Sequence, residues 1–277
     1  SPVEHAEGDS AARLQALVSP FVLRRVKEDV VADLPEKIED TVMAQLTGEQ
    51  RKLYLANQDR IAQQVQHREA SEFKKDKLKV LAELTKLRQI CCDPRLHYED
   101  YKAGSAKLDT CMELVYGALD GGHRILLFSQ FTGMLDIIGK RLAKEDIAFL
   151  KLTGASSKES RAKMVAQFQA GEVPVFLISL KAGGVGLNLT AADVVIHYDP
   201  WWNVAAQDQA TDRAHRIGQQ HTVTVYKLIA KDTIEERIMQ MQESKRDLVN
   251  SVLGGDGISS ALFTREDVLT LLGGDGR

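Results

Sequence analysis

Short apolar runs that alternate with helical segments constrain the fold of this chain more than any other feature of its sequence. Such short strands joined through helices are typical of an α/β fold, with a mostly parallel sheet that is covered by helices on both faces. The strands are predicted at 125–128, 148–152, 175–178, 194–197 and 223–228, and the helices between them at 131–144, 157–170 and 203–217.

The first 120 residues predict long helices instead. Alternating apolar positions over 38–46 indicate one strand. Thr47 and Gln50 have the spacing of a capping box, which predicts a helix that begins there and extends to about residue 65. A second helix is expected over about 73–91, and Ser105 is expected to cap a third that ends near residue 119. The apolar stripe predicted for the second helix consists of Val80, Leu84, Leu87 and Cys91.

Composition and charge narrow the possible functions. The 277 residues suffice for one large domain, and no run of about 18 apolar residues occurs, so we expect no membrane span. The first residues also lack the features of a signal peptide. The three cysteines form no Cys-x2-Cys pair, so we expect neither a metal site nor a disulfide, and a reducing compartment. Because the net charge is −3, any contact with nucleic acid must be local to one face.

Two arginines in the segment Gln209–Gln219 are candidates for phosphate chemistry. Arg213 and Arg216 are three residues apart in a predicted helix, so both side chains should point to one side. A guanidinium group suits phosphate because it donates two parallel hydrogen bonds and stays charged. Two together can act as arginine fingers, which neutralise the charge that develops on a transferred γ-phosphate. The alternative is a solvated helix face on which Asp212 pairs with the arginines.

A glycine-rich loop follows the strand that ends at residue 178. Its glycines, between Lys181 and Gly186, let backbone amides turn toward one anion. Ser179 and Lys181 add a hydroxyl and an ammonium group that suit a phosphodiester oxygen. A tight turn without a ligand is the alternative. The loop is not a dinucleotide fingerprint, because Leu189 replaces the third glycine and the next strand follows too soon for a crossover helix.

Polar residues also follow other strands. Thr153 and Gly154 lie between a strand and a helix capped by Ser156 or Ser157, which is a suitable anion site. Of the indole pair, we expect Trp201 to pack and Trp202 to lie nearer the ligand. Because ligands bind beyond the carboxyl ends of the strands in open α/β sheets, all these groups should meet at one edge. That edge would gather Ser129, Thr153, Ser179, Lys181, the glycine loop, Trp202 and the arginine helix.

Six segments together resemble the C-terminal helicase lobe of Swi/Snf-type ATPases of superfamily II, in the style of bacterial members. They are Phe21–Arg25, Leu127–Phe131, Leu152–Gly154, Ser179–Thr190, Asp199–Asn203 and Gln209–Gln219. The resemblance implies a RecA-like lobe at 38–253, with a helical insertion at about 47–120 and a brace helix at about 233–253. Residues 1–37 would then be an N-terminal segment and connector from a first lobe, and residues 254–277 a C-terminal tail.

The resemblance also implies roles for individual residues. Arg213 and Arg216 would be arginine fingers, and Gln209 would belong to the same nucleotide-sensing motif. Gly184, Gly186 and Asn188 would line ATP. The contacts to DNA would come from Ser129, Thr153, Gly154, Ser179, Lys181 and Trp202. One departure from the family pattern is Val204, where proline is usual.

The function implied by the resemblance is that of the second motor lobe of a double-stranded DNA translocase. ATP would bind between two lobes, and Mg²⁺ would be held by the first lobe, since this sequence has no Gly-x4-Gly-Lys-[Ser/Thr] loop. The lobe alone should therefore be inactive. Its partners would be duplex DNA and the first lobe, with no membrane involved, in the nucleoid-associated cytoplasm if the protein is bacterial.

Two alternatives remain open from the sequence. The chain could be a degenerate lobe that only docks DNA or a protein, although the intact arginine and glycine segments argue against this. The track could also be RNA, in which case contacts to 2′-hydroxyl groups are expected.

Overall fold

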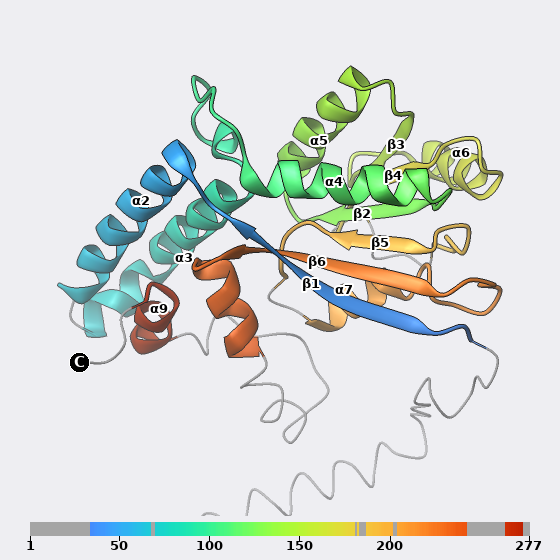
Figure 1. Ribbon diagram of the computed structural model, residues 1–277. Helices are drawn as coiled ribbons and strands as arrows, with labels where there is room; N and C mark the ends of the chain where they lie inside the picture. The colour runs from blue at the N-terminus through green and yellow to red at the C-terminus, as the bar shows by residue number, and fades with distance from the viewer. Residues whose placement is uncertain are drawn as a thin grey trace, which may run out of the picture. The chain divides into compact units, whose positions relative to one another are not determined.

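The computed structural model describes residues 34–67, 70–180, 182, 187–201, 204–242 and 264–273. The described residues form one six-stranded sheet with the order β1-β6-β5-β2-β4-β3, in which every neighbouring pair is parallel (Figure 1). The predicted fold class is confirmed. The strands are β1 (Lys37–Gln45), β2 (Ile125–Ser129), β3 (Phe149–Leu152), β4 (Val175–Ser179), β5 (Val194–His197) and β6 (Val223–Lys231).

Helices connect most of these strands, as the alternating pattern predicts. Residues 234–242 form a helix after β6. None of the helices in the described part of the chain is long and apolar enough to cross a membrane. The other helices are α2 (Gly48–Gln66), α3 (Ala70–Cys92), the 3-10 turn η2 (Pro94–Leu96), α4 (Ala106–Asp120), α5 (Thr132–Lys144), α6 (Lys158–Gln169), α7 (Val204–Thr211) and α9 (Arg265–Leu271).

Both faces of the sheet are covered by helices. In β2, Ile125 and Leu127 pack with α4 and α5, whereas Leu126 and Phe128 pack on the opposite face with residues of α6 and α7. Because successive side chains of a strand point to opposite faces, each strand in the middle of the sheet is apolar along its whole length. This explains the uninterrupted apolar runs of the sequence.

A separate apolar cluster joins α2, α3, α9 and the helix at 234–242. The predicted stripe of α3 lies in or beside this cluster, and each of its four residues is at most 5% exposed. Polar contacts between distant segments support the packing: Ile234 N donates to Tyr54 Oη over 2.7 Å, and Gln58 Nε2 donates to Leu272 O over 2.7 Å. The ammonium group of Lys107 is buried in an ion pair with Glu235 at 2.8 Å.

The capping-box prediction at the start of α2 is wrong. Thr47 precedes α2, but its side chain makes no cap hydrogen bond. Gln50 is buried instead, where its amide donates to the carbonyls of Ile90 and Cys91 and accepts from Ala106 N. Because this side chain joins three helical segments, it is not free to cap its own. The cap predicted at Ser105 is confirmed.

The predicted helix at 203–217 is also wrong in its second half. α7 ends at Thr211, and Arg213 and Arg216 lie in the turns that follow. In a longer helix, the carbonyls of Arg213 and Ala214 would accept from residues 217 and 218. They accept instead from Leu189 N at 3.0 Å and from Gln219 Nε2 at 3.1 Å. The helix therefore ends before both arginines, where one carbonyl accepts from the distant Leu189 and the next from the nearby side chain of Gln219.

Candidate functional site

The carboxyl ends of the parallel strands form one rim of the sheet. Ser129 and Ser179 are register partners at the ends of β2 and β4, and both side chains are buried. The Ser129 hydroxyl donates to Asp199 Oδ1 and accepts from Phe131 N at 3.1 Å. Because the fold itself uses this hydroxyl, we do not carry Ser129 into the proposed DNA contacts.

The loop after β5 is fixed to this rim at successive residues. Asp199 Oδ2 accepts from the backbone and the amide of Gln130. The carbonyl of Pro200 accepts from Arg88 of α3, and the carbonyl of Trp201 accepts from Gln242. Trp201 packs against the core, as expected. Trp202 lies outside the described residues.

The turn after β3 is open to solvent. Thr153 N donates to Ser156 Oγ at 3.2 Å, and Ser157 caps α6. Gly154 is exposed, and a Cβ added there would meet nothing within 4 Å. The backbone at Gly154 and the amino end of α6 are therefore exposed, and the anion site predicted there stays a prediction.

In the glycine loop, the structure describes residue 182 and the residues from 187 onward. Lys181, Gly184 and Gly186 lie outside the described residues. Asn188 is exposed between Leu187 and Leu189, which are buried. Through the hydrogen bond from Leu189 N to the carbonyl of Arg213, this part of the loop lies directly beside the arginine segment.

Among the described residues, Arg213 is buried without a counterion. It is 6% exposed, and neither Nε nor Nη1 has a hydrogen-bond partner in the described part of the chain. Burial, and then the positive charge of Arg161, lowers the pKa of Arg213 to about 10, so the group is still charged at neutral pH. An unpaired buried charge is costly, which favours a ligand that supplies negative charge. Arg216 and Gln209 are exposed nearby in the sequence.

The prediction that all candidate groups meet at one edge needs correction. The segment after α7 starts near the carboxyl end of β5, where His197 Nε2 lies 2.9 Å from Thr211 Oγ1. It reaches the amino end of β5, where Gln219 Nε2 donates to Ala192 O at 2.7 Å. Arg213 therefore lies along the flank of the sheet, whereas Ser129, Thr153 and Ser179 lie at its rim.

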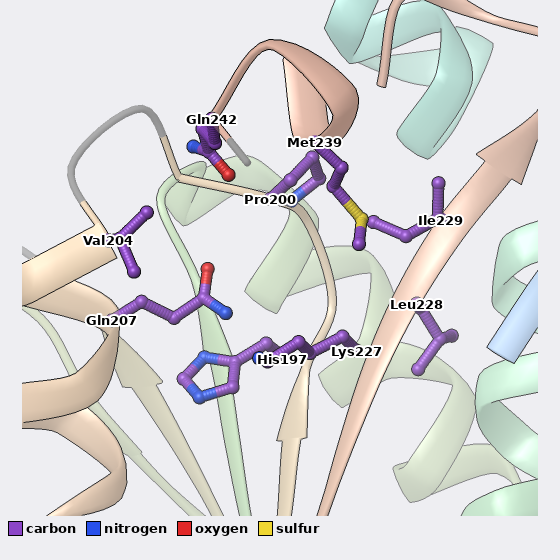
Figure 2. A pocket seen from close by; sticks show the side chains of 9 residues that line it. All are labelled: His197, Pro200, Val204, Gln207, Lys227, Leu228, Ile229, Met239 and Gln242. Carbon is purple, nitrogen blue, oxygen red and sulfur yellow. The ribbon is translucent and has the colours of Figure 1, made fainter. Parts of the chain in front are cut away.

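No sequence pattern predicts one small pocket, of about 90 Å³, that lies between the end of β5, the second half of β6, α7 and the helix at 234–242. Figure 2 shows His197 and Gln207 on one side of it and Met239 and Ile229 on the other. Burial, and then the charge of Lys227, lowers the pKa of His197 to about 3. The imidazole is thus neutral near neutral pH.

Comparisons with known proteins agree with this geometry. Residues 106–218 match the family model described as the helicase conserved C-terminal domain, and residues 1–96 match that of the SNF2-related domain. The chain is 32% identical to the Sulfolobus solfataricus SWI2/SNF2 ATPase C-terminal domain, with a TM-score of 0.70 over 85% of this chain and 98% of that one. With the same ATPase core in complex with dsDNA it shares 36% identity and a TM-score of 0.72, over 94% of this chain and 55% of that one.

Among curated relatives, the putative ATP-dependent helicase/translocase YwqA of Bacillus subtilis is 40% identical over 264 residues, which are 92% of this chain and 28% of the relative. An uncharacterized ATP-dependent helicase of Mycoplasma pneumoniae is 40% identical over 260 residues, or 93% of this chain and 25% of the relative. The fold is thus that of a RecA-like helicase lobe. The chain belongs to the SWI2/SNF2 family of ATPases and spans about a quarter of the length of the curated relatives it matches.

Proposed function

We propose that this chain is the second motor lobe of an ATP-dependent translocase on double-stranded DNA. The observation that carries the proposal is Arg213, a buried guanidinium with two nitrogens that lack partners among the described residues, beside the loop of Asn188. A polyphosphate that enters from outside the lobe would supply the missing acceptors. The fold supports the same conclusion, since a structure of similar fold is an ATPase core in complex with dsDNA.

At the nucleotide, Arg213 and Arg216 would neutralise charge on the transferred phosphate from the flank of the sheet. Gln209, Asn188, Gly184 and Gly186 would complete this side of the nucleotide site. Magnesium, when bound, would neutralise charge on the phosphate chain. The described residues hold no group of three or more His, Cys, Asp or Glu side chains that could bind a metal, and we assign the magnesium ligands to a first lobe.

At the DNA, the turn of Thr153 and Gly154 would bind backbone phosphate through the Thr153 hydroxyl, the exposed backbone at Gly154 and the amino end of α6. Ser179, at the buried end of β4, would present the first peptide groups of the following loop. Lys181 and Trp202 would reach the phosphates and the groove from loops on the same rim. We also propose residues 47–120 as an insertion and 233–253 as a brace helix around this 38–253 lobe, and a site of action on intracellular duplex DNA.

The test is ATP turnover by the full-length protein with Arg213→Ala or Arg216→Ala. Loss of an arginine finger should lower kcat by roughly 10³-fold or more while DNA binding stays close to that of the unchanged protein. Arg60→Ala is the matched control, because Arg60 pairs with Glu83 on the surface. Near-normal turnover in both variants would reject the assigned role. DNA binding without any turnover by the unchanged protein would favour a docking module instead.

A further inference from the structure

Helix α6 presents an arginine on its inward-facing stripe. Phe168 of α6 is fully buried, and Met164 and Val165 pack against the same core cluster as Ala210 and Ala214, which flank Arg213 in sequence. Arg161 is half-buried and precedes Met164 by three residues and Val165 by four, so it continues this stripe by one helical turn. Its position on the helix places it toward the layer that holds Arg213.

The loop of Asn188 connects α6 to the arginine segment. At one side, Gln169 of α6 accepts from Ala191 N at 2.9 Å and donates to Thr190 Oγ1 at 3.3 Å. At the other side, Leu189 N donates to the carbonyl of Arg213. Residues of this loop are thus bonded on one side to α6 and on the other to the segment of Arg213.

Neither arginine has an acidic partner among the described residues. Arg161 carries the positive charge that, after burial, lowers the pKa of Arg213. No ion pair within the described part of the chain includes either residue. The acid nearest to Arg161 in sequence is Glu159, and hydrogen bonds from its own backbone and from Ser157 lower its pKa. This carboxylate is therefore engaged at the start of α6.

Two like charges held close together are unfavourable until an anion lies between them. We propose that Arg161 binds, together with Arg213, a phosphate group of the ligand that this lobe receives. The inference rests on the proposed function and adds to it a phosphate contact on α6. The chemistry required is a phosphate oxygen, which either the nucleotide or the DNA backbone can supply.

The test compares Arg161→Gln, Arg161→Lys and the control Lys163→Gln in the full-length protein. Lys163 is exposed on the same helix, so the control removes one positive charge of α6 away from the inward stripe. ATP turnover is measured across ATP concentrations at saturating DNA, and across DNA concentrations at saturating ATP. Thermal unfolding checks that each variant folds.

Loss of a charge-assisted hydrogen bond in Arg161→Gln should change one of two quantities about tenfold: kcat/KM for ATP should fall, or the DNA concentration for half-maximal turnover should rise. Arg161→Lys should recover part of this loss. A fall in kcat/KM for ATP assigns the contact to the nucleotide. A rise in the DNA concentration for half-maximal turnover assigns it to the DNA backbone. Values equal to those of Lys163→Gln in both titrations would overturn the inference. If the unchanged protein lacked DNA-stimulated turnover, the proposed function would fail first, which is a distinct result.

Discussion

The rim loop at 199–201 and the flank of the sheet around Arg213 differ in whether their buried polar groups have hydrogen-bond partners. In the rim loop, the Asp199 carboxylate and the two following carbonyls all accept hydrogen bonds from side chains of the fold. At the flank, Arg213 is almost equally buried but keeps two nitrogens without a partner in the described chain. Buried polar groups normally have hydrogen-bond partners. We therefore interpret the bonded groups of the rim loop as part of the framework of the fold, and the unbonded nitrogens of Arg213 as groups that bind a ligand.

The largest stability effect should come from the framework. Lys107 lies 5.0 Å from the ring of Tyr198, at the base of the rim loop, and forms a buried ion pair with Glu235. Removing one partner of a buried pair leaves the other uncompensated, so Lys107→Ala should lower the free energy of unfolding by about 3–5 kcal/mol. Arg213→Ala should not lower it, since the substitution removes an uncompensated buried charge and leaves no partner behind.

Chemical denaturation of both variants measures this difference, and Lys79→Ala serves as a surface control because Lys79 is largely exposed. A large loss of stability in Arg213→Ala would contradict the comparison, since it would show that the guanidinium is part of the framework.

A smaller effect should separate two hydroxyl groups at the rim. Ser129→Ala leaves Asp199 Oδ1 and Phe131 N without their buried partner, so the free energy of unfolding should fall by roughly 1–2 kcal/mol with DNA affinity unchanged. Thr153→Ala, in the open turn, should instead weaken DNA binding and leave stability nearly unchanged.

DNA titrations at several salt concentrations, together with denaturation, distinguish the two residues. If Ser129→Ala weakened DNA binding as much as Thr153→Ala, the serine would return to the DNA contacts, and the division between framework and ligand groups would fail at this point.

The framework could be predicted from the sequence better than the site. Strands such as β2 and β4 are continuous apolar runs, and the stripe of α3 repeats at helical spacing, so local pattern alone identifies them. The end of α7 is accompanied by a bond from Leu189, which lies in another loop, and by a local bond from the Gln219 side chain. A sequence pattern carries no record of such long-range bonds, and the same holds for the use of Gln50 and Ser129 inside the fold.

The charges of the site were accessible from the sequence only in part. The arginine pair stood out by its spacing, but Arg161 did not, because its role depends on which layer α6 packs against. Likewise, the pocket beside His197 arises where β5, β6, α7 and the last helix meet, and no single segment predicts it.

The last prediction uses His197, a buried group of which only one ring nitrogen has a hydrogen-bond partner in the described structure. Nε2 bonds to Thr211, while Nδ1 has no partner in the described structure, and burial lowers the pKa to about 3. The unfolded chain therefore binds more protons than the folded one between that value and about pH 6.5, so stability falls as the pH falls through this window. The slope from this one residue should be at most about 1.4 kcal/mol per pH unit.

Between pH 5 and 6.5, most carboxyl groups are ionised in both states. In this range His197→Gln should flatten the decline in stability that denaturation measures, whereas His67→Gln, at an exposed position, should not. An unchanged slope of stability against pH in His197→Gln would show that the imidazole is not held neutral. His197 would then have hydrogen-bond partners for both ring nitrogens, like the framework groups of the rim loop.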